Sequence, residues 1–138
     1  SAKIKYILNL MISIHNMACA EAFLLARKAG VDLQLMADAV MESAAYSKIF
    51  EVRAEKWITG DYEEPTAELA IQLKDKDVIR DFAAALDCPT PMFDAAMPYY
   101  IAAASQGRQQ QDAASILAVL EHMAGIPRDK PPAAKSDD

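Results

Sequence analysis

Apolar residues recur along this chain at the three- and four-residue spacing of helices, and no segment shows the sustained alternation that marks a half-buried strand. The first periodic segment runs from Lys3 to Ala29 without glycine or proline, and Gly30 follows it, where a left-handed glycine ends a helix. Apolar side chains occupy most of the circumference of this predicted helix. We therefore expect other helices or subunits to cover it on nearly every side.

Five shorter helices are predicted after the first, at about residues 33–41, 49–57, 69–86, 91–106 and 116–123. Their predicted N-caps include Asp32, Thr66, Thr90 and Asp112, and Pro91 takes the first helical position after Thr90. The fold class is therefore all-α, a bundle of about six helices built around one long N-terminal helix. Residues 1–125 are expected to form one helical domain, and the polar, proline-rich residues 126–138 a flexible tail.

The composition of the chain argues against some classes of binding partner. The chain has 138 residues, of which 53% are hydrophobic, enough for one domain with a core. Its 20 acidic and 14 basic residues give a net charge of −6, which repels phosphate backbones and argues against a nucleic-acid partner. No uninterrupted apolar run reaches the roughly 20 residues that span a bilayer, so we expect no membrane partner and a cytoplasmic location.

Several kinds of site are not supported by the residues. The four glycines are isolated from one another, so the chain has no glycine-rich loop that would bind the phosphates of a dinucleotide. Cys19 and Cys88 are far apart in apolar surroundings and are expected to be free thiols. His15 and His122 have no metal-ligating residues at suitable spacing, so no metal site is predicted.

One group of polar residues could form a binding or catalytic site. On the first predicted helix, at about 100° per residue, Lys5, Asn9, Ser13 and Asn16 fall within about 80° of one another and form a narrow polar stripe. Lys5 and Asn9 are four residues apart, so an ammonium and an amide can reach the same bound molecule. The pattern alone leaves two interpretations open: a solvent-facing stripe near a helix start, or a binding site that a ligand completes.

The sequence resembles the C-terminal domain of the β-hydroxyacid dehydrogenases, the family of 3-hydroxyisobutyrate dehydrogenase and tartronate semialdehyde reductase. The resemblance extends over about residues 2–125, and its motifs occur in the order and spacing of the family. The matching segments are Lys5-Tyr6-Ile7-Leu8-Asn9, Ala20-Glu21-Ala22, Gly30-Val31-Asp32, Gly60-Asp61-Tyr62, Leu73-Lys74-Asp75, Pro89-Thr90-Pro91 and Gly107 with Asp112.

The resemblance implies a role for three residues. Lys5 matches the catalytic lysine of the family, Asn9 matches a substrate-binding asparagine, and Lys74 matches the lysine of a Lys-Asp pair near the cofactor and substrate. The distance to Pro89 favours Lys74 over Lys76 for the last role. Asp112 also fits the family pattern, but we interpret it as a helix cap and not as a catalytic acid.

The resemblance also implies the reaction. It predicts transfer of a hydride between NAD or NADP and a small 3-hydroxy acid similar to 3-hydroxyisobutyrate, in a homodimer or homotetramer. An N-terminal Rossmann domain, absent from this chain, would hold most of the cofactor, so the chain alone is expected to be inactive. Leu10 and Ala67 depart from residues that are common in the family, which leaves the identity of the hydroxy acid open.

Three alternatives compete with this prediction. The 6-phosphogluconate dehydrogenases have a similar helical domain, but they carry histidine where this chain has Leu8, and their domain is longer. Imine reductases share the fold but generally replace the lysine that Lys5 matches. A non-catalytic helical module for oligomerisation or binding stays open, although such a module has no need for Lys5 and Asn9 in register with the Lys74-Asp75 pair.

Overall fold

The computed structural model describes residues 1–129 and 132, and within them the chain is helical. The elements are α1 (Ala2–Ala29), α2 (Leu33–Met41), α3 (Lys48–Thr59), α4 (Leu69–Ala85), α5 (Pro91–Ser105), a short 3-10 helix η1 (Ala113–Ser115) and α6 (Ile116–Met123). The only strand-like pairing in the described part of the chain is an isolated bridge between Glu68 and Asp112. The all-α prediction is confirmed.

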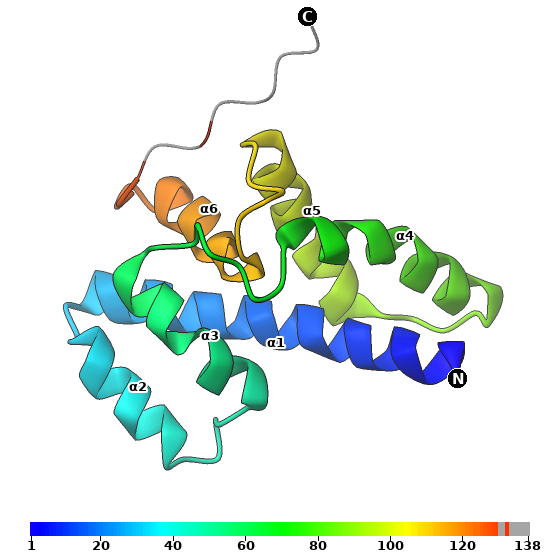
Figure 1. Ribbon diagram of the computed structural model, residues 1–138. Coiled ribbons are helices and arrows are strands. Elements are labelled where there is room, and N and C mark those ends of the chain that lie inside the picture. The colour runs from blue at the N-terminus through cyan, green and yellow to red at the C-terminus, as the bar shows by residue number, and fades with distance from the viewer. Residues whose placement is uncertain (130–131, 133–138) are drawn as a thin grey trace, which may run out of the picture.

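Helix α1 is the element around which the others are arranged. It contacts every other helix, with α2 and α3 along one side and α4, α5 and α6 along the other (Figure 1). Its C-terminal end is formed as predicted, because Gly30 is left-handed at φ 72° and its N–H reaches the carbonyl groups of Ala26 and Arg27. The long helix therefore fixes the positions of side chains that come from distant parts of the sequence.

The capping predictions were correct in part. Asp32 accepts a hydrogen bond from the backbone N–H of Leu35 at 2.8 Å and caps α2. Asp112 caps η1 by accepting from Ala114 N–H at 2.8 Å, which agrees with its interpretation as a cap. The prediction for Thr66 was wrong. Helix α4 starts at Leu69, and the Thr66 hydroxyl instead donates to Asp112 at 3.2 Å.

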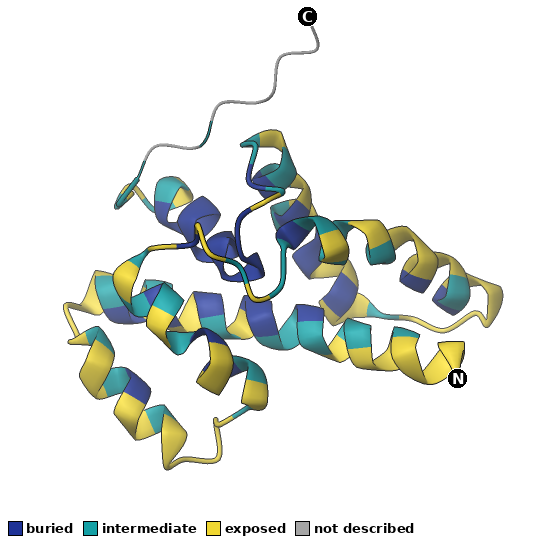
Figure 2. Cartoon of the chain, in the orientation of Figure 1, coloured by how far each residue is buried: buried dark blue, intermediate teal, exposed yellow. Residues whose placement is uncertain are grey.

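The core lies where the C-terminal half of α1 meets α3, α5 and α6. Phe23 stacks on Phe50 with ring centroids 5.6 Å apart and lies 5.4 Å from Trp57, whose indole N–H donates to Ala114 O at 2.9 Å. All residues of α6 from Ile116 to Glu121 are buried (Figure 2). Helix α6, over Ile116 to Glu121, is therefore the helix whose side chains are buried on all sides.

The other helices of this chain leave the N-terminal third of α1 uncovered, so the expected cover there would have to come from another subunit. Ile4, Ile7, Leu8 and Met11 are 58%, 52%, 52% and 45% exposed, and this end of the helix is largely coloured as exposed in Figure 2. The other helices are too short to reach all sides of a helix of 28 residues. A row of apolar side chains consequently remains on the surface of the chain.

Length and composition alone would allow α1 to cross a membrane, contrary to the expectation from uninterrupted apolar runs. A central helix of a folded domain passes the same test. In this structure α1 packs against the other helices of the chain, and its residues Ser13 and Asn16 are buried among them. Part of the apolar surface of α1 is thus buried in the core.

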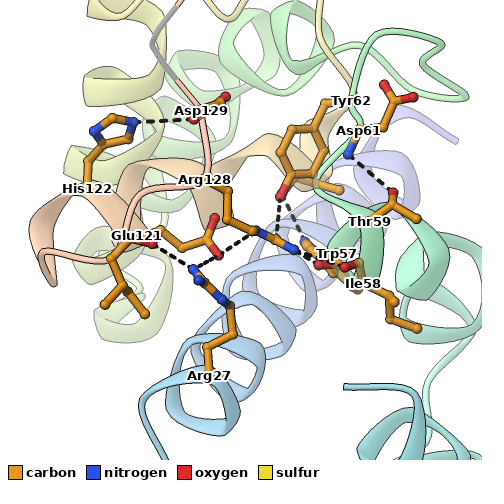
Figure 3. A network of polar contacts seen from close by, with 12 residues as sticks. Arg27, Trp57, Ile58, Thr59, Asp61, Tyr62, Glu121, His122, Arg128 and Asp129 are labelled. Atoms are coloured by element: carbon orange, nitrogen blue, oxygen red, sulfur yellow. Dashed lines mark hydrogen bonds and ion pairs between the residues drawn. The ribbon is translucent and has the colours of Figure 1, made fainter. Parts of the chain in front are cut away.

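The beginning of the predicted tail is attached to the bundle. The Arg128 guanidinium donates to the carbonyl oxygens of Ile58 and Trp57 at 2.9 and 2.8 Å and forms an ion pair with Glu121 at 2.9 Å (Figure 3). Arg27 completes the cluster with a 2.6 Å contact to the same carboxylate. Residues 126–129 therefore pack onto the bundle; residues 130, 131 and 133–138 of the predicted tail lie outside the described residues.

Candidate active site

The polar stripe of α1 divides into an inner and an outer part. Asn16 is completely buried, and its amide donates to Tyr100 Oη and to Ala113 O, both at 3.0 Å. Lys5 is exposed and Asn9 is half-buried, nearer to the N-terminus of the helix. The inner end of the stripe is therefore part of the core, and the outer end is accessible to a ligand.

The outer end of the stripe faces a cleft of about 260 Å³ between α1, α3 and α4. The first two predicted site residues, Lys5 and Asn9, both line this cleft. The complete lining consists of Lys5, Asn9, Ile12, Ser13, Ile49, Arg53, Ala67, Glu68, Ile71, Gln72 and Asp75. The structure thus brings together polar residues that are up to 70 positions apart in the sequence, from Lys5 to Asp75.

Asn9 is oriented by a residue of α4. Its amide nitrogen donates to Asp75 Oδ2 at 3.1 Å across the cleft. The Asn9 carbonyl oxygen then points away from that hydrogen bond, because the two atoms lie on opposite branches of the planar amide. The amide of Asn9 is therefore held ready to accept a hydrogen bond from a hydroxyl or ammonium group.

The two members of the Lys-Asp pair have different surroundings. Asp75 lines the cleft, whereas Lys74 is exposed and is not among the lining residues. Lys76, the less favoured alternative, is half-buried and lies 3.7 Å from Asp77. The site in this chain thus contains the acidic member of the pair, and the lysine Lys74 remains available outside the cleft.

Sequence reasoning expected the Lys74-Asp75 pair of α4 near the site but missed Glu68, Ile71 and Gln72, although a signal was present. Glu68, Ile71, Gln72 and Asp75 follow the i, i+3, i+4, i+7 spacing of one helical face. Gln72 and the flanking acidic groups are polar residues on a face that points toward the bundle. A polar residue on an inward face is a candidate for a site.

Sequence reasoning also missed Arg53 of α3. It is only 4% exposed, it lines the cleft, and its Nη1 donates to Asn16 Oδ1 at 2.7 Å. Burial lowers the pKa of its guanidinium, and the nearby Asp112 carboxylate acts in the opposite direction. No helical pattern identified it, because Arg53 reaches the cleft only through the packing of α3 against α1.

His122, Cys19 and Cys88 do not line the cleft. His122 lies 3.3 Å from Asp129 at the C-terminal end of the described chain. Cys19 is half-buried, and burial raises the pKa of its thiol, while Cys88 is exposed; both are free. Within residues 1–129, no group of three or more histidine, cysteine or acidic side chains is arranged to hold a metal ion.

The chain is similar to proteins of a known family. A sequence model of the family described as "NAD-binding of NADP-dependent 3-hydroxyisobutyrate dehydrogenase" matches residues 1–120. The chain belongs to this family. The resemblance that the sequence motifs indicated is therefore confirmed at the level of the family, and so is the cofactor class, NAD or NADP.

Individual relatives show the same similarity. The chain is 33% identical over 117 residues to L-threonate dehydrogenase of Escherichia coli K12, and 30% identical over 115 residues to 2-hydroxy-3-oxopropionate reductase of the same strain. These matches cover 85% and 83% of this chain but only 38% and 39% of the relatives. The chain thus spans about two fifths of the length of these family members.

Solved structures of the family have the same fold. The crystal structure of 3-hydroxyisobutyrate dehydrogenase from Salmonella typhimurium superposes with a TM-score of 0.79 at 33% identity, covering 83% of this chain and 40% of that one. A Mycobacterium tuberculosis 3-hydroxyisobutyrate dehydrogenase, solved with L-serine, gives a TM-score of 0.77 at 22% identity, covering 86% of this chain and 42% of that one. The helical bundle is therefore shared within the family, while the roles of Lys5, Asn9 and Lys74 stay predictions.

Proposed function

We propose that this chain is the helical, substrate-binding domain of an NAD(P)-dependent dehydrogenase that acts on a small 3-hydroxy acid similar to 3-hydroxyisobutyrate. The observation that carries the proposal is the cleft in which Lys5, Asn9 and Asp75 meet. Oxidation of an alcohol beside a nicotinamide requires a group that accepts the hydroxyl proton and a group that positions the hydroxyl, and a lysine and an oriented amide can supply these two functions. Membership of the family supplies the cofactor class.

Lys5 would transfer the proton of the substrate hydroxyl. Bound NAD(P) accepts or supplies the hydride, and the proton on the hydroxyl oxygen needs a separate acceptor or donor. In the reducing direction, the Lys5 ammonium donates that proton and stabilises the developing alkoxide. In the oxidising direction, the neutral amine of Lys5 accepts it.

Asn9 would hold the hydroxyl group against Lys5. Its amide nitrogen is engaged by Asp75, so the free carbonyl oxygen accepts a hydrogen bond from the substrate hydroxyl. Lys5 lies one helical turn before Asn9, which places both groups on the same side of α1. The pair therefore fixes the position of the reacting oxygen, which is a contribution from orientation.

Most of the dinucleotide would be held outside this chain. Each glycine is isolated, so the phosphates find no glycine-rich loop here, and the exposed Lys74 is the predicted site of contact with an anionic part of the cofactor. We propose that a Rossmann domain preceding this chain in the parent protein binds the cofactor. The 138-residue chain alone should then bind NAD and NADP weakly in calorimetric titrations and should not oxidise hydroxy acids.

Assembly into a homodimer or homotetramer is part of the proposal. The exposed apolar side chains Ile4, Ile7, Leu8 and Met11 on α1 give an unpartnered apolar face that a second subunit can cover. The same face is the observation that favours the alternative, a non-catalytic oligomerisation module. Light scattering at tens of micromolar tests the assembly, and a strict monomer would contradict it.

Replacement of Lys5 in the full-length protein tests the function. Lys5→Met should lower kcat by roughly 10²–10⁴-fold, the usual size of a general acid–base contribution, with little change in cofactor affinity. Lys3→Met is the matched control, because Lys3 is exposed on the same helix and does not line the cleft. If Lys5→Met keeps near-normal kcat and an unchanged pH profile, Lys5 is a solvated surface residue and its catalytic role is refuted.

A further inference from the structure

The guanidinium of Arg53 is a buried positive charge at the wall of the cleft. Only 4% of the residue is exposed, and its one hydrogen bond within the described chain goes to the neutral amide oxygen of Asn16 at 2.7 Å. No carboxylate of residues 1–129 lies within ion-pair distance of it. A guanidinium has five N–H donors, so this partner satisfies a small part of its capacity.

The acidic group with the largest electrostatic effect on Arg53 is Asp112, and it forms no hydrogen bond or ion pair with Arg53 in the described chain. The Asp112 carboxylate acts on the guanidinium through its electric field, but its oxygens accept hydrogen bonds from Thr66 N–H at 3.0 Å and from Ala114 N–H at 2.8 Å. A buried charge without an anionic partner is costly, and buried charges in proteins are generally paired. An anion that enters the cleft would supply the missing partner.

A second unsatisfied group lines the same cleft. The side-chain oxygen Oε1 of Gln72 is buried and has no hydrogen-bond partner. Buried side-chain oxygens normally have one, so an unpaired acceptor in a cleft points to a ligand that brings a donor. Gln72 and Arg53 line one space, and a molecule with both hydroxyl and anionic oxygen groups would bring a donor for the first and an anion for the second.

The order of the groups along α1 sets the direction of such a molecule. Lys5 and Asn9 lie toward the N-terminus of the helix, whereas Arg53 contacts Asn16, and the rise from Lys5 to Asn16 is about 16 Å at 1.5 Å per residue. Lys5, Asn9 and Arg53 nevertheless line the same cleft. A molecule in this cleft can therefore direct its hydroxyl toward one end and its anionic group toward the other.

We propose that Arg53 binds the carboxylate of the hydroxy acid, with the substrate hydroxyl directed toward Lys5 and Asn9. This proposal rests on the proposed function, and it identifies Arg53 as the residue that selects the substrate. The planar guanidinium matches a carboxylate through two parallel N–H···O bonds, which makes the site selective for acids over the corresponding amides or alcohols. Arg53 transfers no proton, so it affects substrate affinity and not the pH dependence of the chemical step.

Isobutyrate and isobutyramide are suitable probes, because they share the skeleton of 3-hydroxyisobutyrate without its hydroxyl and differ from each other in charge. Each is titrated calorimetrically into the full-length protein with saturating NADP or NAD. The variants are Arg53→Gln, which removes the charge, and Arg53→Lys, which keeps it with a single donor group. Arg80→Gln is the control, because Arg80 is exposed on α4 and does not line the cleft.

Arg53→Gln should weaken isobutyrate binding by about 10- to 100-fold, the usual effect of a charged hydrogen bond, and leave isobutyramide binding nearly unchanged. Arg53→Lys should lose less, roughly 3- to 10-fold, because the charge remains but the bidentate geometry does not. In turnover assays the same variants should raise KM for the hydroxy acid and leave the kcat–pH profile unshifted. Thermal melts identify folded variants, and Arg53→Lys carries the test if Arg53→Gln does not fold.

The proposal is overturned if the folded Arg53 variants bind isobutyrate as tightly as the wild-type protein. It is also overturned if both probes lose affinity equally, since that result indicates a structural role for Arg53. Failure of the proposed function gives a different result: the wild-type protein would then oxidise no hydroxy acid with either cofactor, whatever its affinity for isobutyrate.

Discussion

Asn16 is the residue through which the core of the bundle connects to the cleft, and Asn16→Ala should strongly destabilise the protein. The asparagine donates to Tyr100 Oη and Ala113 O and accepts from Arg53 Nη1 at 2.7 Å. It is completely buried, so water cannot replace these contacts in the folded state. The substitution removes all three hydrogen bonds and leaves their partners buried.

The expected loss of stability in Asn16→Ala follows from these three hydrogen bonds. Each neutral hydrogen bond contributes about 1 kcal/mol and the bond to the Arg53 guanidinium about 2 kcal/mol, so the free energy of unfolding should fall by about 4 kcal/mol. Asn9→Ala is the matched control on the same polar stripe. Asn9 is half-buried and makes a single hydrogen bond to Asp75, so its replacement should cost only about 1 kcal/mol.

Urea denaturation followed by circular dichroism and by Trp57 fluorescence measures both values. Trp57 is buried in the core and its indole donates to Ala114 O, next to Ala113 of the Asn16 cluster, so its emission reports on this region. At roughly 4 °C per kcal/mol, Asn16→Ala should also lower Tm by roughly 15 °C. Equal losses for Asn16→Ala and Asn9→Ala would refute the division of the stripe into a structural and a ligand-binding part.

Two further predictions concern stability. Glu121→Gln should lower the free energy of unfolding by about 3 kcal/mol, because it leaves Arg27 and Arg128 without their shared, nearly buried carboxylate, whereas Glu42→Gln on the surface should have no measurable effect in the same urea titration. Burial raises the pKa of Tyr62 and Tyr100. Folding therefore disfavours their ionised forms, and the stability that these groups contribute is fully present below the ordinary tyrosine pKa near 10 and falls as the pH rises above it. Urea midpoints between pH 8 and 11.5 should show this decline, and Tyr100→Phe should reduce its slope; an unchanged slope would argue against Tyr100 as a source.

Local sequence signals determined the helices and many of their ends. Gly30, Asp32 and Asp112 act as predicted, because a left-handed glycine or a capping carboxylate requires only neighbouring backbone groups. The four-residue spacing of Lys5 and Asn9 likewise placed both side chains on one face of α1, and both line the cleft. These features depend on interactions within one or two turns of a helix, which a sequence pattern contains.

Tertiary packing decided what those faces meet. Asn9 and Asn16 are the same residue type on the same stripe, yet one faces the cleft and the other the core, because α4 lies opposite the first and α5, η1 and α3 surround the second. Packing also turned Asp75 into the cleft and placed Arg53 on its wall from α3. The sequence determined which helices form and which residues share a face, while the bundle decided which buried charge has no anionic partner, because that depends on contacts between helices distant in sequence.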